Sequence, residues 1–182
     1  MHPRFEWILA NHCAPVLLGK KPAALLAEKA LPKPCPWALL KQRGFCVISL
    51  SWRGKAPLTL LYHPALLRAV LSQHLVSRKL AAIGYPVEGD WQAHLNFLRR
   101  RFDQSWEFPH EIGFFLGYPP EDVIGFMENR TTCKLSGPWK VFGDVERAQA
   151  IFEEYAQCKR ILLSHIENGG SILIADPPTL TV

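Results

Sequence analysis

Apolar and β-branched residues concentrate in two runs in the first half of the chain. They lie at residues 45–52 and 57–63, and the turn-like segment 53–55 separates them. Two extended runs joined by a short turn are typical of an antiparallel hairpin. A third strand is predicted at residues 139–142. The pattern therefore indicates a small antiparallel sheet of about three or four strands.

Apolar residues at helical spacing predict several helices around this sheet. Prolines and aspartates mark the expected starts, and glycines mark several ends. Leu67, His74 and Leu75 belong to one apolar stripe that predicts a single long helix ending before Gly84. The expected helices cover residues 5–11, 22–29, 64–83, 91–102, 109–116, 120–129 and 145–167.

The composition is that of a folded domain of ordinary size. Of the 182 residues, 48% are hydrophobic and 20% are charged. A chain of this length can bury roughly 70% of its unfolded surface. No internal linker divides the chain, so we predict one α+β domain over residues 1–182. In it, the small antiparallel sheet packs against several helices, and residues 171–182 form a loose tail.

No segment has the pattern of a secretion signal or of a membrane span. The first residues soon reach Asn11 and Pro15 without a clean apolar stretch, and no apolar run approaches the ~20 residues of a membrane helix. The five cysteines include no Cys-x-x-Cys pair, which argues against a disulfide framework and a zinc ribbon. We expect a cytoplasmic protein with no membrane partner.

The net charge of +5 is mild and mostly favours solubility. The densest basic run, residues 99–101, points in three directions on a helix, so we expect a solvated face; an anion contact is the alternative. Two short helices joined by residues 117–119 resemble a helix-turn-helix. The second opens with Glu121 and Asp122, which would meet phosphates with the wrong charge. A nucleic-acid partner is therefore not expected.

Two stretches in the second half of the chain are distinctive. They are FPHEIGFFLGYPPEDVIGF at residues 108–126 and GPWKVFGD at residues 137–144. Together with His-Cys-Ala-Pro at residues 12–15, they resemble a family of small uncharacterised cytosolic proteins of anaerobic bacteria, mainly Firmicutes. Phe142 stands where that family usually has tyrosine, and Val16 stands where it usually has threonine. The resemblance implies a bacterial cytoplasmic protein and brings no established activity.

Cys13, His110 and Glu111 are the candidates for catalysis. Lys20 and Lys21 follow Cys13, and nearby cations lower the pKa of a thiol and make it nucleophilic. The alternative is a buried cysteine that acts as a small hydrophobe. His110 is expected in the first turn of a helix, where the dipole disfavours imidazolium, so a neutral imidazole would be available as a base. The alternative is that His110 and Glu111 cap the helix.

Three functions follow from these groups, and ligand binding ranks first because no complete catalytic signature is present. The first is a small-ligand-binding or accessory protein, whose small-molecule or protein partner binds near Cys13 and His110. The second is a cysteine-dependent enzyme with Cys13 as nucleophile, His110 as base and Glu111 as the orienting carboxylate. The third is a metal- or haem-handling protein, although no two ligands have the helical i, i+4 spacing. No other cofactor is predicted.

A ligand would be held by residues of the same three segments. The thiol of Cys13 and the imidazole of His110 are expected to line one common cleft, which every functional hypothesis above requires. The residues expected to contact the ligand there are His12, Lys20, Gly117, Tyr118, Trp139 and Lys140.

Overall fold

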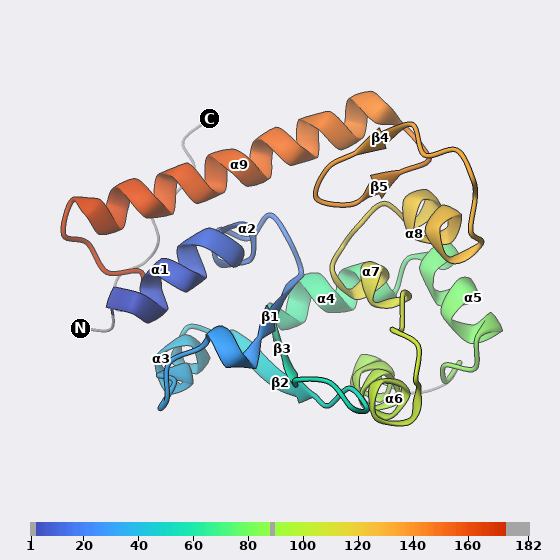
Figure 1. Cartoon of the computed structure of the whole chain (residues 1–182), viewed down its shortest axis with the longest axis horizontal. Coiled ribbons are helices and arrows are strands. Elements are labelled where there is room, and N and C mark those ends of the chain that lie inside the picture. The colour runs from blue at the N-terminus through green and yellow to red at the C-terminus, as the bar shows by residue number, and fades with distance from the viewer. Residues whose placement is uncertain (1–2, 88–89, 174–182) are drawn as a thin grey trace.

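A computed structural model describes residues 3–87 and 90–173 of the chain (Figure 1). It contains a three-stranded antiparallel sheet and a separate two-stranded sheet. The first sheet has the order β1-β3-β2, and the second pairs β4 with β5. Together with the helices around them, these sheets confirm the predicted α+β class. The strands are β1 (Ala23–Ala27), β2 (Cys46–Leu50), β3 (Leu58–Tyr62), β4 (Leu135–Ser136) and β5 (Lys140–Val141).

The strands β2 and β3 form the predicted hairpin, in which Ile48 lies opposite Leu60. The third strand of this sheet was not predicted. The sequence indicates a helix over residues 22–29, and that prediction is wrong, because residues 23–27 form β1 and a 3₁₀ helix, η1 (Glu28–Ala30), follows. Leu25 pairs with Leu60 from the other side of β3. These pairing contacts outweigh the helix propensity of alanine and leucine, which is a weak preference.

The described residues form nine α-helices. Two of the predicted N-caps are confirmed, because Asp90 accepts a hydrogen bond from the backbone N–H of Gln92 and Asp144 accepts one from that of Arg147. The helices are α1 (Pro3–His12), α2 (Ala14–Leu17), α3 (Trp37–Gln42), α4 (Pro64–Leu71), α5 (His74–Ala82), α6 (Trp91–Gln104), α7 (Ile112–Phe115), α8 (Pro120–Met127) and α9 (Val145–Glu167).

The single helix predicted over residues 64–83 is divided in two. Gln73 has an extended backbone, with φ −63° and ψ 131°, and this ends α4 and starts α5 in a new direction. As a result, the apolar stripe does not continue across the break. His74 and Leu75 are exposed rather than part of the core, and Val76 is fully buried in their place.

Helices cover both faces of the three-stranded sheet (Figure 1). Ala24, Leu26 and Leu61 face a hydrophobic cluster that includes side chains of α1, α2 and α9. Ala23 and Leu60 face the opposite way, into a second cluster with α4 to α8. This alternation is the two-residue period of a strand buried on both faces. Among the described residues, no helix is both long and apolar enough to cross a membrane.

The long helix α9 connects the two ends of the molecule. Its C-terminal half packs along α1 and α2, and its N-terminal half contacts the β4–β5 hairpin through Ala148 and Phe152. Part of the predicted loose tail is docked here, because Ile172 is buried and its backbone N–H donates to the Glu6 carboxylate at 2.8 Å. The remainder of that predicted tail, residues 174–182, lies outside the described residues.

Candidate functional site

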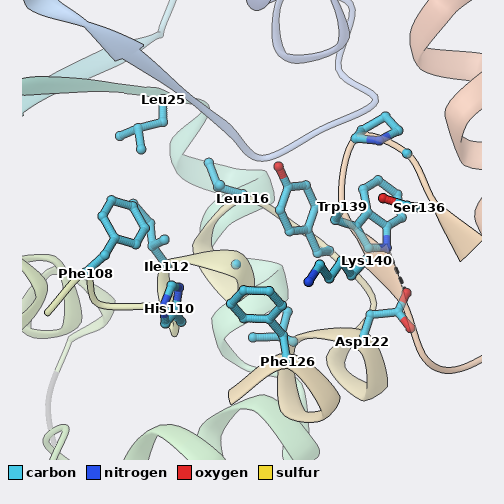
Figure 2. A pocket seen from close by; sticks show the side chains of 15 residues that line it. Leu25, Phe108, His110, Ile112, Leu116, Asp122, Phe126, Ser136, Trp139 and Lys140 are labelled. Atoms are coloured by element: carbon cyan, nitrogen blue, oxygen red, sulfur yellow. Dashed lines mark hydrogen bonds between the residues drawn. The ribbon is translucent and has the colours of Figure 1, made fainter. Parts of the chain in front are cut away.

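A pocket of about 360 Å³ lies between the segment 108–126 and the β4–β5 hairpin (Figure 2). Both distinctive stretches of the sequence therefore form its walls, and Leu25 of β1 completes it. Most of the lining is apolar. The aromatic lining residues are Phe108, Tyr118, Phe126 and Trp139, and the polar ones are His110, Asp122, Ser136 and Lys140.

Two glycines allow the elements around the pocket to approach one another closely. Gly117 ends α7 with φ 75°, and a Cβ atom there would lie 2.4 Å from the ring of Pro22. Gly125 lies within α8, and a Cβ atom there would lie 2.7 Å from Phe142. Both distances are far below van der Waals contact. The glycines of the 108–126 stretch therefore serve to pack the pocket walls together.

The buried carboxylate of Asp122 holds α8 against the β4–β5 hairpin. Its Oδ1 accepts from the backbone N–H groups of Phe142 and Gly143, at 2.7 and 2.8 Å, and its Oδ2 accepts from the indole N–H of Trp139 at 2.8 Å. Only 2% of the side chain is exposed. From the sequence, Asp122 is expected only as an acid at a helix start, and this role was not predicted. No local signal distinguishes an acid at a helix start from a buried acceptor, because the donors to Asp122 lie about twenty residues downstream.

The ring of Trp139 forms the most strongly supported wall of the pocket. It stacks on Tyr118 with centroids 4.7 Å apart and meets Phe152 edge-on at 4.5 Å. Such pairs contribute beyond the area that they bury. Since Asp122 also fixes the indole N–H, the orientation of Trp139 is determined from both sides.

Lys21 lies behind this wall. Its Nζ is 5.1 Å from the ring centroid of Tyr118 and 5.4 Å from that of Tyr155. Burial lowers the pKa of Lys21 to about 8, and the nearby Cys13 thiol opposes that shift. The ammonium ion is stabilised by the two aromatic faces, as in other cation–π contacts.

His110 and Lys140 lie on either side of the Phe126 ring (Figure 2). The imidazole meets this ring edge-on, with the two ring centroids 4.8 Å apart, and its centroid is 5.5 Å from that of Phe108. The Nζ of Lys140 is 5.6 Å from the centroid of Phe126. Both polar side chains are exposed at the pocket. The sequence predicts His110 in the first turn of a helix. In the structure it lies in the turn that precedes α7.

Glu111, which was expected to orient His110, does not line the pocket. Its buried carboxylate accepts a hydrogen bond from Arg101 Nε at 2.9 Å and one from the Tyr85 hydroxyl at 3.3 Å. It makes no side-chain capping bond with α7 either. Burial and the negative charge of Glu111 raise the pKa of Tyr85, so the phenol stays protonated. The Glu111 carboxylate thus joins α7 to α6, and among the described residues it makes no hydrogen bond with His110.

The structure does not bring Cys13 to the pocket. The side chain is fully buried among residues of α1, α2 and α9, in the other hydrophobic cluster. Burial raises the pKa of Cys13 to about 12, against the opposing effect of Lys21. The expected common cleft of Cys13 and His110 is therefore wrong. The neighbouring cation exists, but desolvation of the thiolate outweighs it.

Of the other residues expected to contact a ligand, some lie at the pocket and some do not. Tyr118, Trp139 and Lys140 line the pocket with His110, and Gly117 adjoins it. His12 is exposed at the end of α1, and Lys20 forms an ion pair with Glu154 of α9 at 3.1 Å. Neither lines the pocket. In the part of the chain that the structure describes, no three His, Cys, Asp or Glu side chains are arranged to hold a metal ion.

The basic run also differs from its prediction. Arg99 and Arg100 both line a second, more polar hollow between α6 and β2, beside Ser49 and Ser51. Arg101 turns away to Glu111. The run therefore provides two arginines on one face rather than three in separate directions. Asp103 lies in the same hollow, so its charge is mixed.

Taken together, the fold and the pocket define an α+β protein with an aromatic cavity between a helical segment and a short hairpin. The chain belongs to the family described as "Protein of unknown function (DUF3793)", which matches residues 9–174. The matched range contains every pocket residue. This agrees with the predicted resemblance to an uncharacterised family. Searches of curated proteins and of solved structures returned no significant match.

Proposed function

We propose that this protein binds a small, largely apolar ligand in the pocket between residues 108–126 and the β4–β5 hairpin. The observation that carries the proposal is a cavity of about 360 Å³ walled by four aromatic side chains. Ligand sites in proteins are typically concave, mostly apolar and of about 300–1,000 Å³, with a few polar groups that orient the ligand. This pocket has each of those properties.

The walls are held in place by contacts that do not depend on a ligand. Asp122 fixes the indole of Trp139, and Tyr118 and Phe152 pack on its ring. A ligand that enters a pre-formed pocket does not have to order these side chains, so little affinity is lost to conformational entropy. Support from interior packing favours a binding site over an accidental surface hollow.

Ligand binding, which already ranks first from the sequence, is favoured over catalysis by Cys13. A nucleophilic cysteine needs access and a lowered pKa, whereas Cys13 is fully buried and its pKa is raised to about 12. His110 has no hydrogen bond to a carboxylate among the described residues, so no orienting partner supports it as a base. The imidazole is better suited to contact a ligand at the pocket mouth.

A neutral fluorescent probe tests this function. N-phenyl-1-naphthylamine is an apolar aromatic molecule whose fluorescence rises when it leaves water, so titration of the intact protein gives its Kd. Phe126, which is 36% exposed, forms one wall of the pocket. We expect Phe126→Ala to weaken binding about tenfold, because a stacked ring contact is lost.

The matched control is Trp106→Ala. Trp106 is 71% exposed, contacts Arg53 and does not line the pocket, so its loss removes an exposed aromatic ring elsewhere. The control should bind the probe as the unmodified protein does. Absence of saturable binding, or equal weakening by both substitutions, would contradict the proposal.

A further inference from the structure

We propose that the ligand of this pocket is an organic anion, with a flat apolar body against the aromatic walls and one anionic group beside Lys140. This inference rests on the proposed function and names its ligand class. The juxtaposition behind it is an exposed ammonium group on the rim of an aromatic cavity whose single carboxylate is already fully hydrogen-bonded.

The two charged side chains that line the pocket differ in their partners. Asp122 provides the negative charge, but both of its oxygens accept hydrogen bonds from the protein interior. Lys140 provides the positive charge, and it has no ion pair and no hydrogen bond with any described residue. Its contact with the Phe126 ring leaves the three N–H donors of the ammonium group available.

A second cation near the pocket adds to the positive charge of Lys140. The ammonium group of Lys21 lies behind the Tyr118 ring, which forms one pocket wall. The carboxylates on the adjoining segments are engaged elsewhere, since Glu111 pairs with Arg101 and Glu121 pairs with Arg147. An exposed cation on an apolar rim, whose neighbouring carboxylates are paired elsewhere, favours a ligand of negative charge.

Two further hydrogen-bond donors line the same pocket. Ser136 and Lys140 are partners across the β4–β5 hairpin, so their side chains extend from the same face of it. Neither the Ser136 hydroxyl nor the Tyr118 hydroxyl has a hydrogen-bond partner among the described residues, and both residues line the pocket. A carboxylate or sulfonate group accepts several hydrogen bonds at once and suits this set of donors.

The position of Lys140 defines how the ligand lies. Figure 2 shows the lysine reaching from the side of Trp139 to the Phe126 ring, with His110 beyond that ring. An anionic group at the lysine leaves the apolar part of the ligand to pack on the apolar lining of the pocket. The deeper lining there is apolar and includes Leu116 and Val123. This geometry excludes polyanions, whose further charges would have to enter the apolar end.

Two probes with the same ring system separate this inference from the proposed function. N-phenyl-1-naphthylamine is neutral, and 1-anilinonaphthalene-8-sulfonate adds one sulfonate group to the same body. We expect the intact protein to bind the sulfonate five- to tenfold more tightly, which is on the order of one exposed ion pair in a partly apolar site. The advantage should fall as salt is raised from about 0.05 to 0.5 M, because salt screens it.

Variants at Lys140 assign that advantage to one residue. Lys140→Gln should reduce the ratio of the two Kd values towards one, whereas Lys140→Arg keeps the charge and should preserve the ratio. Lys159→Gln removes an exposed lysine of α9 that does not line the pocket and serves as the matched control. Both probes must also bind more weakly to Phe126→Ala, which shows that they occupy this pocket.

The outcomes are distinguishable. If both probes bind at Phe126 but with equal affinity, or if Lys140→Gln leaves the sulfonate advantage unchanged, the anion proposal is overturned and the proposed function stands. If neither probe binds, both proposals fail. If the sulfonate binds more tightly than the neutral probe and Lys140→Gln removes this difference, both proposals are supported.

Discussion

The surroundings of Cys13 and the surroundings of Lys140 differ in what they leave available to solvent. Cys13 lies in an interior formed by α1, α2 and α9, where apolar side chains enclose the sulfur completely. Lys140 lies on a cavity with walls that are almost as apolar, but its ammonium group is exposed and unpaired among the described residues. Reactive chemistry is therefore suppressed in the first region, whereas recognition is possible in the second.

Lys21 lies between the two regions, and burial also changes the pKa of its own side chain. It lies close enough to Cys13 for their charges to interact, and it also contacts the Tyr118 ring behind the pocket. Burial shifts the pKa of both groups towards their neutral forms. A cation next to a thiol therefore activates it only where water can also reach the thiolate.

The reactivity of Cys13 should give the largest effect. With a pKa of about 12, the thiolate fraction near pH 8 is about a thousandfold lower than for a thiol with the usual pKa. We expect iodoacetamide to leave Cys13 unmodified in the folded protein while the half-buried Cys133 reacts, as peptide mass spectrometry would show. Rapid, stoichiometric labelling of Cys13 would restore the cysteine-enzyme hypothesis.

The network at Asp122 should be the next most sensitive feature. Asp122→Ala leaves two buried N–H donors and one partly buried N–H donor without an acceptor, so we expect the free energy of unfolding to fall by about 3 kcal/mol. Asp122→Asn keeps an oxygen for the two backbone groups but presents an amide N–H₂ to Trp139, so about half of that loss is expected. Urea unfolding measures both changes.

The exposed Asp103 of α6 provides the control for these substitutions. Asp103→Ala removes a carboxylate that has no ion pair among the described residues, and it should change stability by less than about 0.5 kcal/mol. If Asp122→Ala were equally mild, the pocket wall would not depend on the buried carboxylate.

The pH dependence associated with Lys21 should be the smallest effect. The folded pKa of about 8 lies below the unfolded value of 10.5, so above pH 8 the unfolded state binds more protons than the folded one. Stability attributable to this residue therefore rises with pH, by about 1 kcal/mol between pH 7 and 9. Relative to Lys21→Met, the unmodified protein should gain stability over this range, and a relative loss would contradict the assigned burial.

Sequence patterns predicted those parts of the fold that carry their own local signals. The β2–β3 hairpin has two extended runs with a turn, and α6 and α9 have apolar periodicity with an aspartate cap. By contrast, β1 consists of alanine and leucine, which have no strand preference, and only the edge of β3 makes it a strand. Long-range pairing is not visible in a local window.

The candidate site was predicted only where its residues belong to a local motif. The distinctive stretches led to His110, Tyr118, Trp139 and Lys140, which the fold assembles around one cavity. The burial of Cys13, which the sequence offers as an alternative, depends on α9, which begins more than 130 residues later in the chain and encloses the thiol. The local sequence shows the cations near the thiol but not the helix that excludes water.

The central claim is that the pocket at Trp139, and not the interior around Cys13, receives the ligand. The six tryptophan indole N–H groups give separate signals in a two-dimensional ¹H–¹⁵N NMR spectrum. Trp139 lines the pocket, whereas Trp37 packs on Phe5 in the cluster that contains Cys13. Titration with 1-anilinonaphthalene-8-sulfonate should shift the Trp139 signal saturably and leave Trp37 unchanged. A saturable shift of Trp37 with Trp139 unchanged would contradict the account.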